Sequence, residues 1–165
     1  MRQFRAFTLV LVLLLPSWSV RADDAELQAS VKTLAHSLSD GYATLHPNDI
    51  TILHSQSSQD AVALFLLVGL GGGNGSSQYI VFFNRNEPIP GKRNRVAPYR
   101  LVAISQVGFR GWRLFNFRTA RFRSGAVSIA GRSFLPKDAM CCPSQPIKIT
   151  ISISQGRITE QSGGG

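Results

Sequence analysis

The chain has 165 residues, of which 44% are hydrophobic and 16% are charged, and it carries a net charge of +9. Beyond its first 22 residues, no apolar run reaches the roughly 20 residues that a membrane-spanning helix requires, so no such helix is predicted there. The length is that of a single domain large enough to bury a core of its own.

The first 22 residues have the pattern of a secretory signal peptide. Arg2 and Arg5 precede an apolar stretch from Ala6 to Leu15, and Val20-Arg21-Ala22 precedes the predicted cut at Asp23. An uncleaved membrane anchor is the alternative, but this apolar stretch has about half of the length that a spanning helix needs. We expect a mature chain of 143 residues with a net charge of +6, located in the periplasm or secreted.

The mature chain is predicted to begin with an amphipathic helix over residues 23–40. Apolar residues recur there at the helical spacings of four, three and four, at Leu27, Val31, Leu34 and Leu38. Gly41 follows as a plausible C-terminal stop. The apolar stripe of this helix is expected to pack on the core.

From about residue 50 onward, the pattern changes to β-strands joined by short connections. Strands are predicted at residues 60–70, 78–84, 101–107, 114–123, 126–129 and 147–154, and residues 157–160 turn back on the last of these. Short connections favour antiparallel neighbours. We therefore predict an α+β fold over residues 23–161, in which the N-terminal amphipathic helix packs on an antiparallel meander sheet of about six strands. Residues 71–77 are expected to form a flexible connection, residues 85–99 a long exposed loop, and residues 162–165 a disordered tail.

The charges are divided unevenly between two blocks of the chain. Residues 23–84 hold one lysine and six acidic residues, a net of −5, whereas residues 85–132 hold eleven basic residues and one acid, a net of +10. Attraction between the two blocks within the fold is one interpretation. Binding of an anionic partner is the other, because ten of the eleven cations are arginines, whose planar guanidinium binds carboxylates and phosphates. The candidate residues for such binding are Arg110, Arg113, Arg118, Arg121 and Arg123.

Motifs for catalysis or cofactor binding are missing from the sequence. No Lys-Ser or Lys-Thr pair follows the glycines of residues 71–75, so a phosphate-binding loop is not predicted. His36, His46 and His54 match no metal-ligand spacing, and no Gly-x-Ser-x-Gly motif occurs. We therefore predict no catalytic residue, no cofactor and no metal site.

Cys141 and Cys142 are the two cysteines of the chain, and they are adjacent. An oxidising compartment favours pairing of the two with each other, although adjacent Cα atoms lie about 3.8 Å apart, which is closer than in most disulfides. Two further interpretations remain open: free thiols that bind a soft metal such as Cu(I), and a bridge to another chain.

The segment Asp138-Ala139-Met140-Cys141-Cys142-Pro143-Ser144, followed by an alternating strand, resembles a group of uncharacterised exported bacterial proteins with a C-terminal Asp-x-Met-Cys-Cys-Pro-Ser/Thr segment. The resemblance implies a periplasmic or secreted domain and adds no catalytic residue.

The leading functional hypothesis is a non-enzymatic periplasmic or secreted binding domain for an anionic envelope component or a protein partner, with an inhibitor or immunity protein as one version. Lipopolysaccharide phosphates, acidic glycans or an acidic protein fit the predicted compartment, whereas export argues against nucleic acid. The alternatives are a redox or copper-handling protein that uses Cys141 and Cys142, and a hydrolase whose site the sequence does not reveal.

Overall fold

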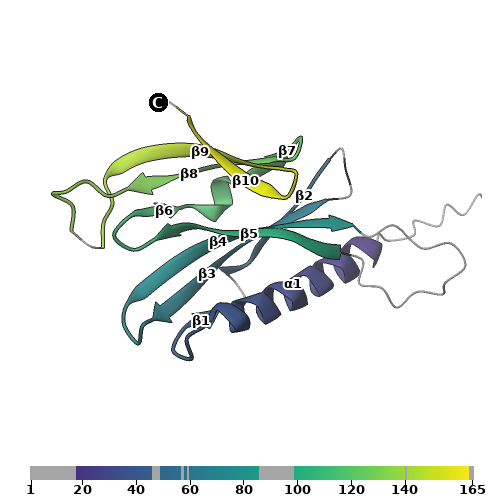
Figure 1. Ribbon diagram of the computed structural model, residues 1–165, viewed down its shortest axis with the longest axis horizontal. Helices are drawn as coiled ribbons and strands as arrows, with labels where there is room; N and C mark the ends of the chain where they lie inside the picture. The colour runs from purple at the N-terminus through teal and green to yellow at the C-terminus, as the bar shows by residue number, and fades with distance from the viewer. Residues whose placement is uncertain are drawn as a thin grey trace, which may run out of the picture.

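The computed structural model describes residues 18–45, 49–56, 58, 60–85, 99–139 and 141–163 (Figure 1). The helix α1 (Trp18–Leu38) packs against a ten-stranded antiparallel sheet. Its strands are β1 (Thr44–Leu45), β2 (Thr51–His54), β3 (Ala61–Leu70), β4 (Gly75–Arg85), β5 (Tyr99–Phe109), β6 (Arg113–Phe115), β7 (Arg121–Arg123), β8 (Ala126–Ser133), β9 (Gln145–Ser154) and β10 (Arg157–Gly163). Their order is β1-β3-β4-β5-β6-β8-β9-β10, with β2 also paired to β3 and β7 to β8. Within the described ranges, no helix has the length and apolar character needed to cross a membrane.

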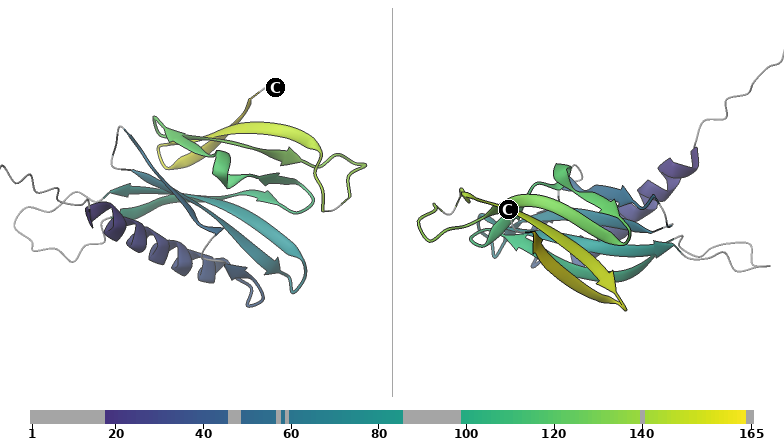
Figure 2. Two further views of the ribbon diagram at one scale, coloured as in Figure 1. Left: turned by 180° about the vertical axis from the view of Figure 1, so that it is seen from behind. Right: turned by 90° about the horizontal axis from the view of Figure 1, so that it is seen from above.

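The sheet is divided into two halves that face each other. We call β1 to β5 the first half-sheet and β6 to β10 the second half-sheet. One register pair, Phe109 opposite Arg113, joins β5 to β6. The main core lies between the halves, with residues such as Leu64 and Phe82 from the first packed together with Ile129 and Ile151 from the second. With α1 on the other side of the first half-sheet, the molecule has three layers (Figure 1, Figure 2).

The helix buries most of the side that its apolar spacing predicts, but Leu38, the last residue of the predicted stripe, is 38% exposed. Leu27, Val31 and Ala35 are buried in a second core cluster, against the face of β3 that holds Ala63 and Phe65. The helix begins at Trp18, five residues before the predicted start, so the proposed cleavage site lies within α1. It ends at Leu38 rather than at residue 40.

Asp40 lies just beyond the helix and ties its end to the first half-sheet. One carboxylate oxygen accepts hydrogen bonds from the amides of Tyr42 and Ala43, and the other accepts one from the Gly71 amide at 2.5 Å. These bonds, that from Gly71 foremost, hold the pKa of the Asp40 carboxyl below its ordinary value. Gly71 lies in the turn between β3 and β4, with a φ of 72° that favours glycine.

The α+β class is confirmed, whereas the prediction of about six strands is too low. The short strands β1 and β2 lack the apolar runs from which the longer strands were predicted. The strand predicted over residues 114–123 is divided into β6, a 3₁₀ helix (Phe117–Thr119) and β7, because the Asn116 side chain accepts a hydrogen bond from the Arg118 amide and starts that helical turn.

Two predicted flexible segments also differ from the structure. The connection between β3 and β4 is shorter than residues 71–77, since β4 begins at Gly75. β10 extends to Gly163, so that Ser162 and Gly163, which the sequence assigned to a tail, pair with β9. The loop predicted at residues 85–99 lies outside the described residues except for its two ends, which belong to β4 and β5.

Candidate functional site

The second half-sheet has one buried face and one open face. Its strands turn alternate residues inward, and residues directly opposite each other on antiparallel strands share a face. Phe122, Val127, Ile129, Ile149 and Ile151 point into the core between the two half-sheets and are buried. The residues between them therefore form the opposite surface, which no described element covers (Figure 2).

We call this surface the outer face. It consists of Leu114 of β6, Arg121 and Arg123 of β7, Ala126, Ser128, Ala130 and Arg132 of β8, Pro146, Lys148, Thr150, Ser152 and Ser154 of β9, and Arg157, Thr159, Gln161 and Gly163 of β10. Five of these residues are cations and none is an acid. Glu160 is the one acid within β6 to β10, and it belongs to the inward-facing set of β10, opposite Ile151.

The cations of the outer face surround a floor of small hydroxyl side chains. Arg121 is opposite Ser128, which is opposite Thr150. In the next row, Ser152 is opposite Thr159, and their hydroxyls are hydrogen-bonded at 2.8 Å. We call Ser128, Thr150, Ser152 and Thr159 the hydroxyl floor. All five cations, Arg121, Arg123, Arg132, Lys148 and Arg157, are exposed.

The cations extend along the whole length of the outer face. Arg157 is opposite Ser154 near one end of β9, and Arg132 is opposite Pro146 near the other end. Those two positions are eight steps apart along β9, which corresponds to about 27 Å at about 3.4 Å per residue. Lys148 and the arginines of β7 lie between these ends.

Arg113, one of the predicted binding residues, is part of the fold instead. Its side chain is 10% exposed and binds both carboxylate oxygens of Glu160, at 2.5 and 2.6 Å. Its Nε donates to the carbonyl of Val107, and its guanidinium lies 3.7 Å from the ring centre of Trp112. Because Arg113 is largely buried, with each of its three nitrogens in a hydrogen bond and its flat face against Trp112, it does not belong to an open binding surface.

The other four predicted arginines are also not gathered in one place. Arg110 lies in the turn between β5 and β6, where its side chain donates to the carbonyl of Asn74 at 2.9 Å. Arg121 and Arg123 lie on the outer face, and Arg121 also donates to the carbonyls of Ala120 and Arg118. Arg118 is exposed in the 3₁₀ helix, between β6 and β7.

Three cations of the outer face were not among the predicted binding residues: Arg132, Lys148 and Arg157. A signal for Lys148 was present, because it alternates with the isoleucines of β9 and so belongs to the wet side of that strand. What the sequence could not supply is the register that puts this side next to Arg121 and Arg123.

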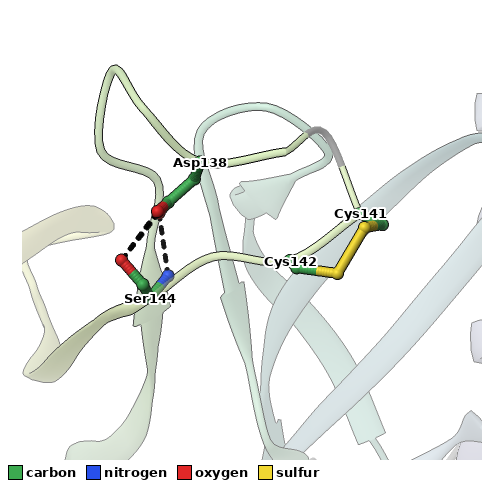
Figure 3. Close-up of a disulfide and its surroundings, with 4 residues drawn as sticks. All are labelled: Asp138, Cys141, Cys142 and Ser144. Carbon is green, nitrogen blue, oxygen red and sulfur yellow. Dashed lines mark hydrogen bonds between the residues drawn. A yellow bond between two sulfur atoms is a disulfide. The ribbon is translucent and has the colours of Figure 1, made fainter.

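The cysteine motif, residues 138–144, lies in the connection between β8 and β9, and its first and last residues, Asp138 and Ser144, are hydrogen-bonded to each other (Figure 3). The Asp138 carboxylate accepts hydrogen bonds from the Ser144 hydroxyl and amide, at 2.7 and 2.9 Å, and from the Leu135 amide. The Leu135 amide and the Ser144 hydroxyl are the main reasons why the pKa of this carboxyl is lowered. These contacts give the aspartate and the serine of the motif a physical role.

Between those two residues, the sulfurs of Cys141 and Cys142 lie at disulfide distance, with Cα atoms 3.8 Å apart (Figure 3). Both cysteines are exposed. The next residue, Pro143, lines a shallow hollow of about 410 Å³ together with Leu114, Ala130 and Arg132. The cysteine loop therefore borders one end of the outer face.

The remaining candidates from the sequence have ordinary surroundings. His54 is hydrogen-bonded to Asp24 at 2.6 Å on the surface, His36 is exposed in α1, and His46 lies outside the described residues. Among residues that the structure describes, no group of three His, Cys, Asp or Glu could hold a metal ion. The glycines after β3 form a turn between two strands, without the following helix that a phosphate loop needs.

No protein family, curated protein or solved structure matches this chain. The functional argument therefore depends on the residues and their arrangement alone.

Proposed function

We propose that this protein is a non-enzymatic binding domain that holds an anionic partner on the outer face of its second half-sheet. The observation that carries the proposal is the presence of five cations and no acid on one open face. Such a surface attracts anions, because nothing on the face itself neutralises the cations. Ion pairing within the fold does not account for them: the two ion pairs described, Asp24–His54 and Arg113–Glu160, involve none of the five.

The predicted compartment belongs to the same proposal. If the chain is exported by its N-terminal segment, the anionic partner is an envelope or extracellular component, or an acidic protein. The acidic residues Asp24 and Glu26 lie on α1, at the opposite side of the three layers. The molecule therefore presents its basic side to such a partner and its more acidic side away from it.

Two variants with the same change in net charge test the proposal. One loses two cations from the outer face, and the control loses two cations from elsewhere on the surface. The variant Arg121→Ser/Arg123→Ser removes two cations from the face, and Lys32→Ser/Arg100→Ser removes two exposed cations from α1 and β5. We expect the first variant to elute from an immobilised polyanion at clearly lower salt and to bind up to about thirtyfold more weakly, since an exposed ionic contact contributes up to about 1 kcal/mol.

The control variant should elute close to the unchanged protein. Equal losses in the two variants would show that binding follows net charge and not the outer face. Circular dichroism of both variants establishes that each is folded before the comparison is made.

A second candidate, a redox function, is favoured by one observation. The Cys141–Cys142 pair is exposed, so a small dithiol or a redox partner protein can reach its sulfurs. Alkylation of the unreduced protein, followed by mass spectrometry, shows whether the two sulfurs are bonded to each other.

A further inference from the structure

The residues of the outer face indicate which kind of anion it binds. The inference drawn from them rests on the function proposed above. The hydroxyl floor offers groups that both donate and accept hydrogen bonds. Phosphate and carboxylate oxygens only accept, whereas the hydroxyls of a sugar do both. A ligand that combines acid groups with sugar hydroxyls therefore matches both the cations and the floor.

The length of the face favours an extended ligand. Its end cations, Arg157 and Arg132, are about 27 Å apart along β9 at about 3.4 Å per residue. A single phosphate or a single acidic head group would contact only part of this distance. A chain with acid groups at intervals can contact the end cations, Lys148 and the β7 arginines at the same time.

The composition of the face argues against the other common polyanions. Its residues include no aromatic side chain, whereas proteins that hold single-stranded nucleic acid stack the bases on aromatic rings. The larger apolar residues on it are Leu114 and Pro146, both at one end. That is too little for insertion into a lipid surface, which requires an apolar face beside the basic one.

We infer that the ligand of the outer face is an anionic polysaccharide, with carboxylate or sulfate groups along its length, lying across the hydroxyl floor between the cations. The small side chains of Ser128 and Thr150 let the sugar rings approach the sheet. Arg121 and Arg123 on one side, and Lys148 within the sheet, then pair with its acid groups.

The test compares four probes by calorimetry with the full chain: polygalacturonate with its oligosaccharides, inorganic polyphosphate, single-stranded DNA, and anionic phospholipid vesicles. We expect polygalacturonate to bind most tightly, and its oligosaccharides to gain affinity with length until they span the face. Preference for polyphosphate, DNA or vesicles would overturn the polysaccharide assignment while leaving the anionic partner in place. Failure to bind any of the four would overturn the proposed function itself.

A variant of the floor separates recognition of the sugar from attraction of charge. Thr150→Tyr leaves every cation in place and puts a ring on the floor, so we expect an about tenfold loss of affinity for polygalacturonate and little change for polyphosphate. Thr150→Ser keeps the hydroxyl and should bind like the unchanged protein. If Thr150→Tyr affects both polyanions equally, the floor does not recognise sugar and the inference fails.

Discussion

The two half-sheets differ in how many of their faces are buried, and this difference decides which side chains a partner could contact. The first half-sheet is covered by α1 on one side and by the second half-sheet on the other, so β3 buries consecutive residues from Ala61 to Phe65. The second half-sheet is covered on one side only, and β9 alternates between isoleucines, of which Ile149 and Ile151 are buried, and polar residues that are half-buried or exposed. A strand that is buried on both faces has no side chain available for a partner, whereas a strand that is buried on one face has every second side chain available.

The largest expected effect is the loss of stability when a buried side chain of the first half-sheet is removed, compared with a substitution on the outer face. Phe65→Ala removes a fully buried ring that stacks on Tyr79 in the first half-sheet. We expect the free energy of unfolding in urea to fall by about 3–5 kcal/mol. Ser128→Ala on the outer face should change it by no more than about 0.5 kcal/mol. Similar losses for the two variants would mean that the outer face is covered in solution.

A smaller effect is expected where the two half-sheets meet. Glu160→Gln leaves the Arg113 guanidinium, which is 10% exposed, without its carboxylate. We expect a loss of about 2–3 kcal/mol in the free energy of unfolding, because a largely buried charge loses its partner. Arg157→Gln, on the same strand but on the outer face, is the matched control and should cost almost nothing.

The double variant Arg113→Met/Glu160→Leu distinguishes the ion pair from packing. Because both charges are removed together, it should be more stable than Glu160→Gln. A double variant that is less stable than the single one would show that the hydrogen bond to Val107 and the contact with Trp112 matter more than the charge pair.

The smallest effect is expected at the cysteine loop. A ring closed by adjacent residues restricts the unfolded chain little, and the contacts between Asp138 and Ser144 already hold the loop ends. Cys141→Ser/Cys142→Ser should therefore lower the free energy of unfolding by less than about 1 kcal/mol, compared with about 2–4 kcal/mol for an ordinary disulfide. Mass spectrometry of the unreduced, alkylated protein measures the pair directly. Uptake of two alkyl groups by the monomer would show that the two cysteines are free thiols and that no disulfide is present.

Acid should open the same loop independently of the cysteines. Since the pKa of Asp138 is lowered in the folded protein, its stabilising contribution is present above the ordinary carboxyl pKa and is lost as the pH falls through the lowered value. We expect the protection of the Ser144 amide against hydrogen exchange, relative to an unstructured peptide at the same pH, to fall in that acid range while the protection of the core amides is unchanged.

The sequence predicts the elements of this fold better than their arrangement. The leucine spacing of α1 and the isoleucine alternation of β9 each reflect burial of one side, so both elements follow from periodicity. The folding of one half-sheet over the other does not, because it depends on the turn from Arg110 to Trp112 and on contacts between distant strands.

For the candidate site, the sequence identified the excess of arginine but not which arginines are available. Arg113 is followed by Leu114 and Phe115, and nothing in this local pattern shows that Glu160, 47 residues away, binds it. Lys148 and Arg157, on the other hand, lie outside the basic block. The outer face collects cations by strand register, and a count along the chain does not contain this information.

The connectivity of the sheet has a consequence for the order in which the protein can fold. The chain passes from one half-sheet to the other once, between β5 and β6, so the second half-sheet is built from the single stretch of residues 113–163. Its pairings β8–β9 and β9–β10 join strands that follow each other in the chain, and such local pairings close small loops at low entropic cost. The stretch that carries the outer face can therefore form its hydrogen-bonded ladder early, and it needs the first half-sheet mainly to cover its apolar side.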